Sequence, residues 1–286
     1  MGEGSQVSKA VLITGCSTGI GRATAERLAK KGMTVYATAR RSESIADLEQ
    51  AGCRTLALDV TDEESMRAAV AAVEEVEGAV GALVNNAGYS QSGAVESLDL
   101  DELRRQFETN VFGLTRMCQL VLPGMRRQGH GRIANVSSMG GKLVFPGGGA
   151  YHATKHAVEA LSDALRFEVG NFGVAVSIIE PGLIRTDFAQ TSVASLASGT
   201  DSTGVYGQFN TAVGSATAGA YEGPLARLGG GPGAVARAIE RAITSKHPRT
   251  RYRVTASARL LLTQRKLVPD RVWDRIVSSS FPRPGG

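Results

Sequence analysis

The sequence predicts an α/β protein with a single doubly wound, Rossmann-type domain, in which helices cover both faces of a parallel sheet. Short apolar runs alternate with longer helical patterns, and a glycine-rich turn follows the first of these runs. Neither an internal repeat nor a linker divides the 286 residues. Alternating strands and helices are typical of a parallel sheet buried between two helical layers. The chain is long enough to bury a substantial core without disulfides or metals.

The expected strands are short runs rich in Val, Ile, Leu and Ala and bounded by Gly, Asp or Asn, a pattern typical of buried strands. They are Ala10–Ile13, Thr34–Thr38, Thr55–Leu58, Ala82–Val84, Arg132–Val136 and Val174–Ile179. Helical patterns lie between and after these runs. The expected helices are Ile20–Lys31, Ser44–Ala51, Asp62–Val76, Leu100–Arg127, Ala150–Asn171 and Pro232–Ser245. Arg251–Val254 is expected to be an edge strand.

Two segments depart from this alternation. We expect one domain over residues 1–286, with a core at 8–187, a substrate lid at 188–228 and a C-terminal extension at 255–286. The stretch Ala189–Gly233 is rich in Ser, Thr, Gly and Ala and has weak periodicity. A long irregular stretch inside a compact domain is usually a lid or a binding loop. We therefore expect a mobile lid that orders over the substrate.

The segment Leu260–Ser279 contains amphipathic pieces in which arginines and lysines interleave with large apolar residues. Such a pattern fits either packing against the lid or an interfacial helix on a membrane surface. Packing is favoured, because the pieces are short and Pro269 interrupts them.

Charge and composition exclude several classes of protein. The formal net charge is +5, and a basic balance fits a phosphate-rich ligand, nucleic acid, an anionic membrane or simply a solvated surface. No basic run is interleaved with aromatics, so nucleic-acid binding is not expected. The sequence shows no signal peptide and no apolar run long enough to span a membrane, and its three cysteines are scattered. We expect reduced thiols, no metal and a cytoplasmic location.

The turn Thr14–Gly21, which reads TGCSTGIG, follows the first expected strand and precedes the first helix. Glycines at this place let the backbone approach a pyrophosphate, and the helix N-terminus supplies free N–H groups and partial positive charge. A glycine-rich turn without a ligand is the alternative, but the strand–turn–helix context disfavours it. The expected contacts to a dinucleotide are Gly15, Ser17, Thr18, Gly19, Ile20 and Gly21.

The second strand ends in Ala39-Arg40-Arg41, where an NAD-binding protein usually has an acidic residue for the ribose 2′-hydroxyl. A guanidinium binds phosphate through a bidentate fork and stacks on flat rings. Arg40 is therefore expected to hold a 2′-phosphate and to cover the adenine. The sequence predicts NADP(H), with NAD(H) less favoured; two surface arginines at the start of a loop are the alternative.

Tyr151 and Lys155 are four residues apart in an expected helix, so they share one face. A free tyrosine has a pKa of ~10. A neighbouring ammonium, together with the positive nicotinamide ring of the oxidised cofactor, favours the phenolate and lowers that pKa. Tyr151 is therefore a candidate acid and base. Ser138 follows an expected strand at the carboxyl edge, where sites of α/β proteins lie, and its hydroxyl can donate to a substrate oxygen. The neighbouring Ser137 is the competing candidate.

Further motifs follow in order along the chain. They are Asp59-Val60, Asn85-Asn86-Ala87-Gly88, Asn110, Ser137-Ser138, Tyr151-x-x-x-Lys155 and Pro181-Gly182. Together with TGCSTGIG, they resemble the short-chain dehydrogenase/reductase family, from Thr14 to about Thr186. The strings AYHATKHAVEALSDALRFEV and EPGLIRTDF resemble the NADP-type branch that holds hydroxysteroid and retinol dehydrogenases.

The resemblance implies roles for the catalytic candidates. It gives the substrate contact to Ser138, the acid/base role to Tyr151, and a contact to the nicotinamide ribose to Lys155. Asn110 would link to Lys155 through water in a proton relay; a buried polar residue bonded to backbone is its alternative reading.

The resemblance also implies the cofactor contacts. Asp59 would bond the adenine amino group beside the Val60 backbone, although it could instead cap the helix that begins near Asp62. The other implied contacts are Asn86, Ala87 and Gly88 along the adenine ribose, Tyr151 and Lys155 at the nicotinamide, and Pro181, Gly182, Ile184 and Thr186 after the sixth strand.

The implied reaction is reversible hydride transfer between NADP(H) and a small secondary alcohol or ketone. Apolar residues flank the motifs and predict an apolar substrate of steroid, retinoid or fatty type. The expected substrate contacts are Ser138, Met139, Val144, Phe145, Tyr151 and Phe188. A 3-ketoacyl thioester reductase, a non-catalytic NADP-sensing regulator and a nucleic-acid module are the alternatives. The resemblance also implies a homodimer or homotetramer.

Overall fold

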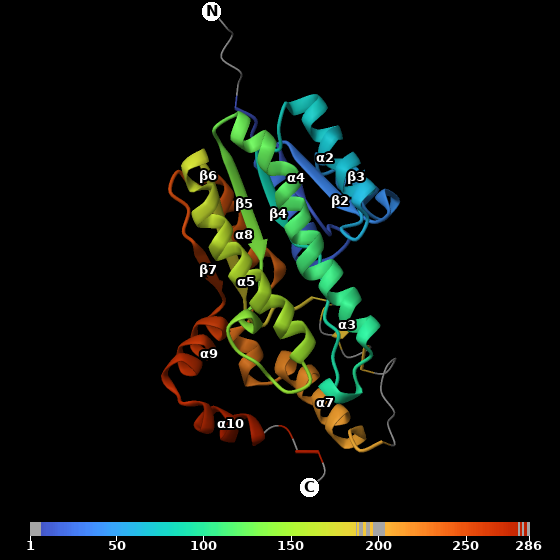
Figure 1. Cartoon of the computed structure of the whole chain (residues 1–286), viewed down its shortest axis with the longest axis vertical. Helices are drawn as coiled ribbons and strands as arrows, with labels where there is room; N and C mark the ends of the chain where they lie inside the picture. Colours follow the sequence, from blue (N-terminus) through green and yellow to red (C-terminus); the bar gives the residue numbers. More distant parts are fainter. Residues whose placement is uncertain are drawn as a thin grey trace, which may run out of the picture.

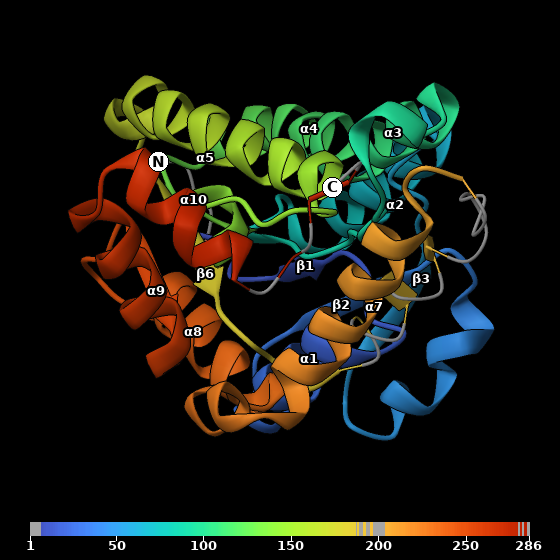
Figure 2. The ribbon, with the colours of Figure 1, turned by 90° about the horizontal axis from the view of Figure 1, so that it is seen from below.

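The computed structural model describes residues 7–186, 188, 191–192, 195–196, 204–279, 281 and 283–284. A seven-stranded parallel sheet lies between two layers of helices, as Figures 1 and 2 show. Its strand order is β3-β2-β1-β4-β5-β6-β7, which confirms the doubly wound fold. The strands are β1 (Val11–Ile13), β2 (Val35–Ala39), β3 (Arg54–Ala57), β4 (Ala82–Asn85), β5 (Gly131–Val136), β6 (Val174–Pro181) and β7 (Arg251–Val254).

The helices alternate with the strands along the core and then gather at the C-terminal part of the chain. The α-helices are α1 (Gly19–Lys30), α2 (Glu63–Glu77), α3 (Leu100–Phe107), α4 (Leu114–Arg127), α5 (Gly149–Val169), α7 (Gly207–Glu222), α8 (Pro232–Thr244), α9 (Ala256–Leu267) and α10 (Asp270–Ser278). The 3-10 turns are η1 (Ser42–Glu49), η2 (Val95–Ser97), η4 (Met139–Gly141), η5 (Gly170–Phe172) and η6 (Pro224–Leu228).

The core has two halves because successive residues of a strand point to opposite faces of the sheet. In β1, Val11 and Ile13 pack in the half covered by α1 and α8, whereas Leu12 packs in the half covered by α2, α4 and α5. Both faces are therefore dry, which explains why the strands read as unbroken apolar runs rather than alternating ones. Figure 2 shows α4 and α5 on one side of the sheet and α1 and α8 on the other.

The expectation of a single helix over Leu100–Arg127 is wrong in one respect. A π-helical turn, Glu108–Gly113, separates α3 from α4. The chain packs very closely here, because a Cβ on Gly113 would lie 2.2 Å from the carbonyl oxygen of Val60. Such turns are rare and occur mostly at functional sites. Asn110 lies inside it.

The expectation of an irregular stretch over 189–228 is wrong for the part that the structure describes. Gly207–Glu222 forms helix α7, whose Phe209 and Val213 are one turn apart and pack against Leu196 and Ala94. Small residues dominate the rest of α7, so its apolar period is weak in the sequence. Residues 189–190, 193–194 and 197–203 of the expected lid lie outside the described residues.

The C-terminal segment packs onto the core, as favoured from the sequence. Leu262 of α9 and Trp273 of α10 are buried against Leu143. Phe281 packs on the apolar cluster of Phe209 in α7. Figure 1 shows α7, α9 and α10 together beyond the end of the sheet to which β5 points. Among the described helices, none is long and apolar enough to cross a membrane.

Candidate active site

One cavity of about 1650 Å³ opens along the carboxyl ends of the strands. It runs from the glycine turn after β1, past the residues that follow β4, β5 and β6, to helices α7, α9 and α10. A pocket for one small ligand is ~300–1,000 Å³, so this cavity has room for a dinucleotide and a second molecule. Its position at the switch between β1 and β4 is where ligands bind in doubly wound sheets.

The glycine turn has the backbone that the sequence predicts. Gly15 and Gly19 have φ angles of +73° and +58°, which favour glycine. A Cβ on Gly21 would lie 2.1 Å from the carbonyl oxygen of Gly15, so any side chain there would break the turn. Thr18, at the N-cap of α1, makes no side-chain capping hydrogen bond, which leaves the first N–H groups of α1 for a ligand. Gly15, Ser17, Thr18, Gly19 and Ile20 line the cavity.

Asn86 holds this turn in place rather than reaching into the cavity with its amide. Its Nδ2 donates to the carbonyl oxygens of Thr14 and Gly15, at 3.0 and 2.9 Å. The hydroxyl of Thr14 accepts from the N–H groups of Asn86 and Ala87, both at 3.0 Å. The motif after β4 therefore fixes the phosphate turn after β1, and Ala87 and Gly88 line the cavity beside it.

The structure distinguishes the two arginines after β2. Arg40 lines the cavity and is exposed, and within the described part of the chain no carboxylate pairs with it. Arg41 is exposed and does not contribute to the lining. Ala39 is buried and supplies no acid where an NAD-binding protein would have one.

Asp59 also lines the cavity, next to Val60. Its Oδ1 accepts from the N–H and the hydroxyl of Thr61, at 2.9 and 2.8 Å. Asp62, not Asp59, caps helix α2, since its carboxylate accepts from the N–H groups of Glu64 and Ser65. The capping alternative for Asp59 is therefore wrong.

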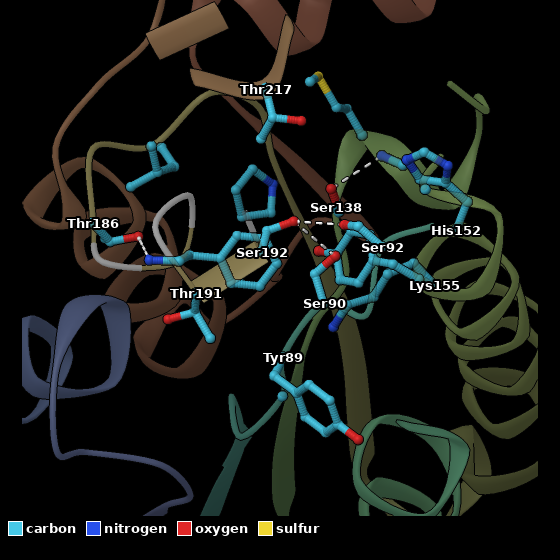
Figure 3. Close-up of a pocket in the computed structure, with 18 of the residues that line it drawn as sticks. Tyr89, Ser90, Ser92, Ser138, His152, Lys155, Thr186, Thr191, Ser192 and Thr217 are labelled. Atoms are coloured by element: carbon cyan, nitrogen blue, oxygen red, sulfur yellow. Dashed lines mark hydrogen bonds between the residues drawn. The ribbon is translucent and has the colours of Figure 1, made fainter. Parts of the chain in front are cut away.

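Ser138, Tyr151 and Lys155 all line the cavity, and Figure 3 draws Ser138 and Lys155 among the residues around it. Lys155 Nζ donates to the carbonyl oxygen of Val136 at 2.9 Å and lies 5.7 Å from the centre of the Tyr151 ring. The hydroxyls of Tyr151 and Ser138 share a hydrogen bond. Ser137 also borders the cavity, but it is buried, and its Oγ lies close to Gly141, where an added Cβ would be 2.7 Å away. The structure thus brings together the residues expected from the motif spacing.

Burial controls the protonation of this pair. Burial raises the pKa of the Tyr151 phenol, and the hydrogen bond from Ser138 opposes this rise only in part. Burial also lowers the pKa of Lys155 to about 8, against the attraction of the Glu159 carboxylate. In the protein without cofactor, desolvation of the phenolate outweighs the nearby amine. The expected lowering of the Tyr151 pKa, which also depends on the positive nicotinamide ring of the oxidised cofactor, stays a prediction.

Asn110 is fully buried beside Lys155. A Cβ on Gly88 would lie 3.0 Å from Asn110 Oδ1 and 3.7 Å from Lys155 Nζ. The amide of Asn110 donates to the carbonyl oxygen of Tyr89 at 2.9 Å and to Thr154 Oγ1 at 3.1 Å, and its Oδ1 accepts from the Tyr89 N–H at 3.1 Å. Both amide protons are used, so the alternative reading of a buried polar residue holds for this side chain.

The chain after β6 contributes the opposite wall. Pro181, Gly182, Ile184 and Thr186 line the cavity as expected. Gly182 has no room for a side chain, because a Cβ would lie 2.5 Å from the hydroxyls of Thr255 and Ser257. A Cβ on Gly19 would touch Thr186 at 3.4 Å, so this segment closes over the glycine turn.

Three of the expected apolar substrate contacts line the cavity, and one does not. Met139, Phe145 and Phe188 line it, and the Phe188 ring lies 5.4 Å from that of Tyr151. Val144 is 48% exposed and is absent from the described lining, so that expectation is wrong. Its neighbour Leu143 is the residue that points inward and lines the cavity.

Several residues that line the cavity were not predicted from the sequence. His152 lines the cavity one residue after Tyr151; burial lowers its pKa to about 4, so it is neutral, and its Nδ1 accepts from the Phe145 N–H at 3.4 Å. The hydroxyls of Ser90, Ser92 and Ser192 form a cluster in the cavity lining (Figure 3). Ser192 Oγ lies 2.8 Å from Ser92 Oγ and 3.3 Å from Ser90 Oγ. Ser90 and Ser92 directly follow the Asn-Asn-Ala-Gly motif, which was the available signal.

The sheet, the glycine turn and the tyrosine–lysine pair define a Rossmann-fold oxidoreductase. The sequence model of the short chain dehydrogenase family matches residues 9–197. The NADPH-dependent 3-dehydrocapnine reductase of Ornithobacterium rhinotracheale is 33% identical, over 93% of this chain and 94% of that enzyme. Retinol dehydrogenase 16 of Rattus norvegicus is 35% identical, over 96% of this chain and 90% of the rat enzyme.

Solved structures agree with the sequence comparison. A short-chain dehydrogenase from Streptomyces avermitilis superposes with a TM-score of 0.76 at 35% identity, and the match covers 96% of each chain. The protein therefore belongs to the short-chain dehydrogenase family.

Proposed function

We propose that the protein interconverts apolar secondary alcohols and ketones with NADP(H), using Tyr151 as acid and base. The observation that carries this proposal is the meeting of Ser138, Tyr151 and Lys155 in one cavity that continues from the glycine turn into an apolar chamber. NADP(H), when bound, supplies or accepts the hydride.

The proton chemistry follows from the protein's own residues. A buried Tyr151 phenol stays protonated near neutral pH, which is the form that can donate to the oxygen of a ketone. The Ser138 hydroxyl can donate to the same oxygen and stabilise the developing negative charge. Lys155, with a pKa of about 8, is protonated at pH 7 and favours the phenolate that remains. In the oxidative direction, the phenolate takes the proton back.

Asn110 takes part in the proposed proton relay through its main chain rather than its side chain. Both side-chain amide protons are used and Oδ1 already accepts from the Tyr89 N–H, so we assign the water-mediated link to Lys155 to the main-chain carbonyl of Asn110. The π-helical turn around Asn110 departs from regular α-helical hydrogen bonding, which supports this role.

The residues present fit NADP(H). The turn has no room for a Cβ on Gly15 or Gly21, so its backbone stays bare toward the cavity and could approach a pyrophosphate. Arg40 offers a guanidinium that has no carboxylate partner in the described chain and could bind a 2′-phosphate. We assign Asp59 and Val60 to the adenine and Gly182, Ile184 and Thr186 to the nicotinamide end. The NADPH dependence of the Ornithobacterium relative supports this choice.

The chamber beyond Tyr151 supports an apolar substrate of steroid, retinoid or fatty type. Its apolar lining comes from several elements: Met139, Leu143, Phe145, Phe188, Val213, Leu261, Trp273 and Val277. The rat relative is a dehydrogenase named for retinol, which is an apolar alcohol. We further propose that the segment 188–228, with α7, closes over this chamber as a lid.

A substrate screen tests the proposal. NADPH consumption is followed by its absorbance with ketones of increasing apolar size, for the wild type and for Ser138→Ala. We expect turnover that rises with apolar size, and a loss of roughly 10²–10³ in Ser138→Ala, the scale of one oxyanion donor. Tight NADPH binding without turnover of any ketone would favour the non-catalytic regulator instead.

A further inference from the structure

Helices α9 and α10 each have a buried face and an exposed apolar stripe. Leu262 and Trp273 are buried against the core. On the exposed sides, Leu260 and Leu267 are 51% and 75% exposed on α9. The other exposed stripe consists of Val272 and Ile276 on α10. Val272 and Ile276 are one turn apart on one face of α10. Leu260 and Leu267 are two turns apart on one face of α9, with the polar Thr263 and Gln264 between them.

The cavity opens between these two stripes. Leu260 and Ile276 both line the cavity and are both exposed, which places them at its mouth. Leu267 and Val272 continue the stripes away from the mouth and do not contribute to the described lining. An apolar molecule that enters here passes between exposed apolar side chains.

Cations flank both stripes. Arg259 and Lys266 precede Leu260 and Leu267 by one residue, and Arg271 and Arg275 stand in the same relation to Val272 and Ile276. All four are exposed, and no carboxylate of the described chain forms an ion pair with them. Arg265 is the exception in this segment, because it pairs with Asp270 at 2.6 Å. These helices carry five basic residues and two acidic residues, Asp270 and Asp274.

We propose that α9 and α10 dock on a membrane surface that carries anionic lipid headgroups, with the cavity mouth against the lipid. An exposed apolar stripe flanked by arginines and lysines is the pattern of an interfacial helix: the stripe enters the acyl boundary and the cations meet the headgroups. The idea that the arriving molecule is a substrate rests on the proposed function; the docking itself does not.

Other occupants fit these faces less well. A second copy of the chain, related by a two-fold axis, would bring the same unpaired cations against one another. A nucleic acid would satisfy the cations but would leave the apolar stripes, including Leu267, against its phosphates. Of these occupants, an anionic lipid surface is the one that matches both the exposed apolar residues and the cations beside them.

Vesicle flotation of the full chain tests the proposal without any turnover. We expect the protein to float with vesicles of phosphatidylcholine mixed with phosphatidylserine, less with phosphatidylcholine alone, and less at high salt. Each surface cation contributes ~1 kcal/mol near an anionic leaflet, so Arg271→Gln/Arg275→Gln should weaken binding about thirtyfold. Leu267→Ser should weaken it through loss of apolar burial.

A matched pair controls for net charge. Arg237 and Arg241 on α8 have the same spacing as Arg271 and Arg275, are exposed, and have no ion-pair partner among the described residues. Arg237→Gln/Arg241→Gln should leave flotation unchanged. Absence of flotation with phosphatidylserine, equal weakening by both pairs, or protection of residues 256–278 from hydrogen exchange by dimerisation without vesicles would overturn the proposal. Because binding is measured directly, a lack of ketone turnover would contradict only the proposed function.

Discussion

Lys155 lies one helical turn after Tyr151 on α5, with its Nζ 5.7 Å from the centre of the tyrosine ring and bonded to the Val136 carbonyl oxygen. Helix α5 packs against β6 and against the turn η4 that follows β5, so the pair is held beside Ser138, which lies between β5 and η4. A buried amine and a buried phenol each lose the hydration of their charged form, and this desolvation has measurable consequences.

The buried lysine should reduce the stability of the fold. Its pKa is about 8 in the folded protein against an ordinary value of 10.5, so the unfolded chain binds more protons between these values. The loss of folding stability caused by the buried ammonium is therefore complete below about pH 8, and it disappears as the pH rises to 10.5. Lys155→Met should raise the free energy of unfolding at pH 7 by roughly 1–3 kcal/mol, with a smaller gain at about pH 10. Urea unfolding at both pH values measures this, and Lys246→Met, at an exposed site, is the control.

Arg40 should decide between the two nicotinamide cofactors. A tenfold preference needs ~1.4 kcal/mol, which one charge-assisted phosphate contact can supply. We expect NADPH to bind at least about tenfold more tightly than NADH, and Arg40→Asp to reverse the order. Arg41→Asp is the matched control, since Arg41 does not line the cavity. Equal affinities in the wild type, by fluorescence titration, would contradict the assignment.

Arg251 should be the main stabilising cation of the sheet edge. It contacts the buried carboxylates of Glu159 at 3.0 Å and Glu180 at 3.2 Å, which are 2% and 0% exposed. Without Arg251, each buried carboxylate keeps only one partly exposed cation, Lys142 for Glu159 and Arg253 for Glu180, so its charge is less well compensated. Arg251→Met should therefore cost about 3 kcal/mol in the free energy of unfolding. Arg166→Met, which breaks a more exposed pair with Asp163, should cost less than about 1 kcal/mol; similar losses in both variants would show that burial is not the cause.

The outer faces of α4, α5 and the π-helical turn should form the contact between subunits. Phe167 is 91% exposed, and Phe112 and Leu161 are also exposed. Large apolar side chains exposed together mark interaction surfaces. We expect light scattering to show a dimer or tetramer at micromolar concentration and Phe167→Glu to shift the protein toward smaller species. A wild-type monomer would refute this.

Sequence patterns predicted the strands and the motif residues well, because each depends on local chemistry. β7 begins and ends as expected and lies at the edge of the sheet, where a strand with alternating charged residues, Arg251 and Arg253, is tolerated. Ser138, Tyr151 and Lys155 line one cavity, as expected when the carboxyl ends of parallel strands meet at one edge of the sheet, and their roles stay predictions.

The rest depended on tertiary packing that no local pattern records. The π-helical turn reflects the approach of Gly113 to Val60, residues distant in sequence. Helix α7 is stabilised by contacts of Phe209 and Val213 with other segments, not by its own weak period. Whether Leu143 or Val144 lines the cavity depends on where the loop turns. The raised pKa of Tyr151 depends on how deeply its phenol is buried.

Replacement of Tyr151 by phenylalanine tests the central claim most directly. The change removes only the hydroxyl, so NADPH affinity, measured by titration, should stay within a few-fold of the wild type. Turnover of the best ketone from the screen should fall to the background, because the proton donor is lost. Turnover near the wild-type rate in Tyr151→Phe, with NADPH binding intact, would contradict the assignment of Tyr151 as acid and base.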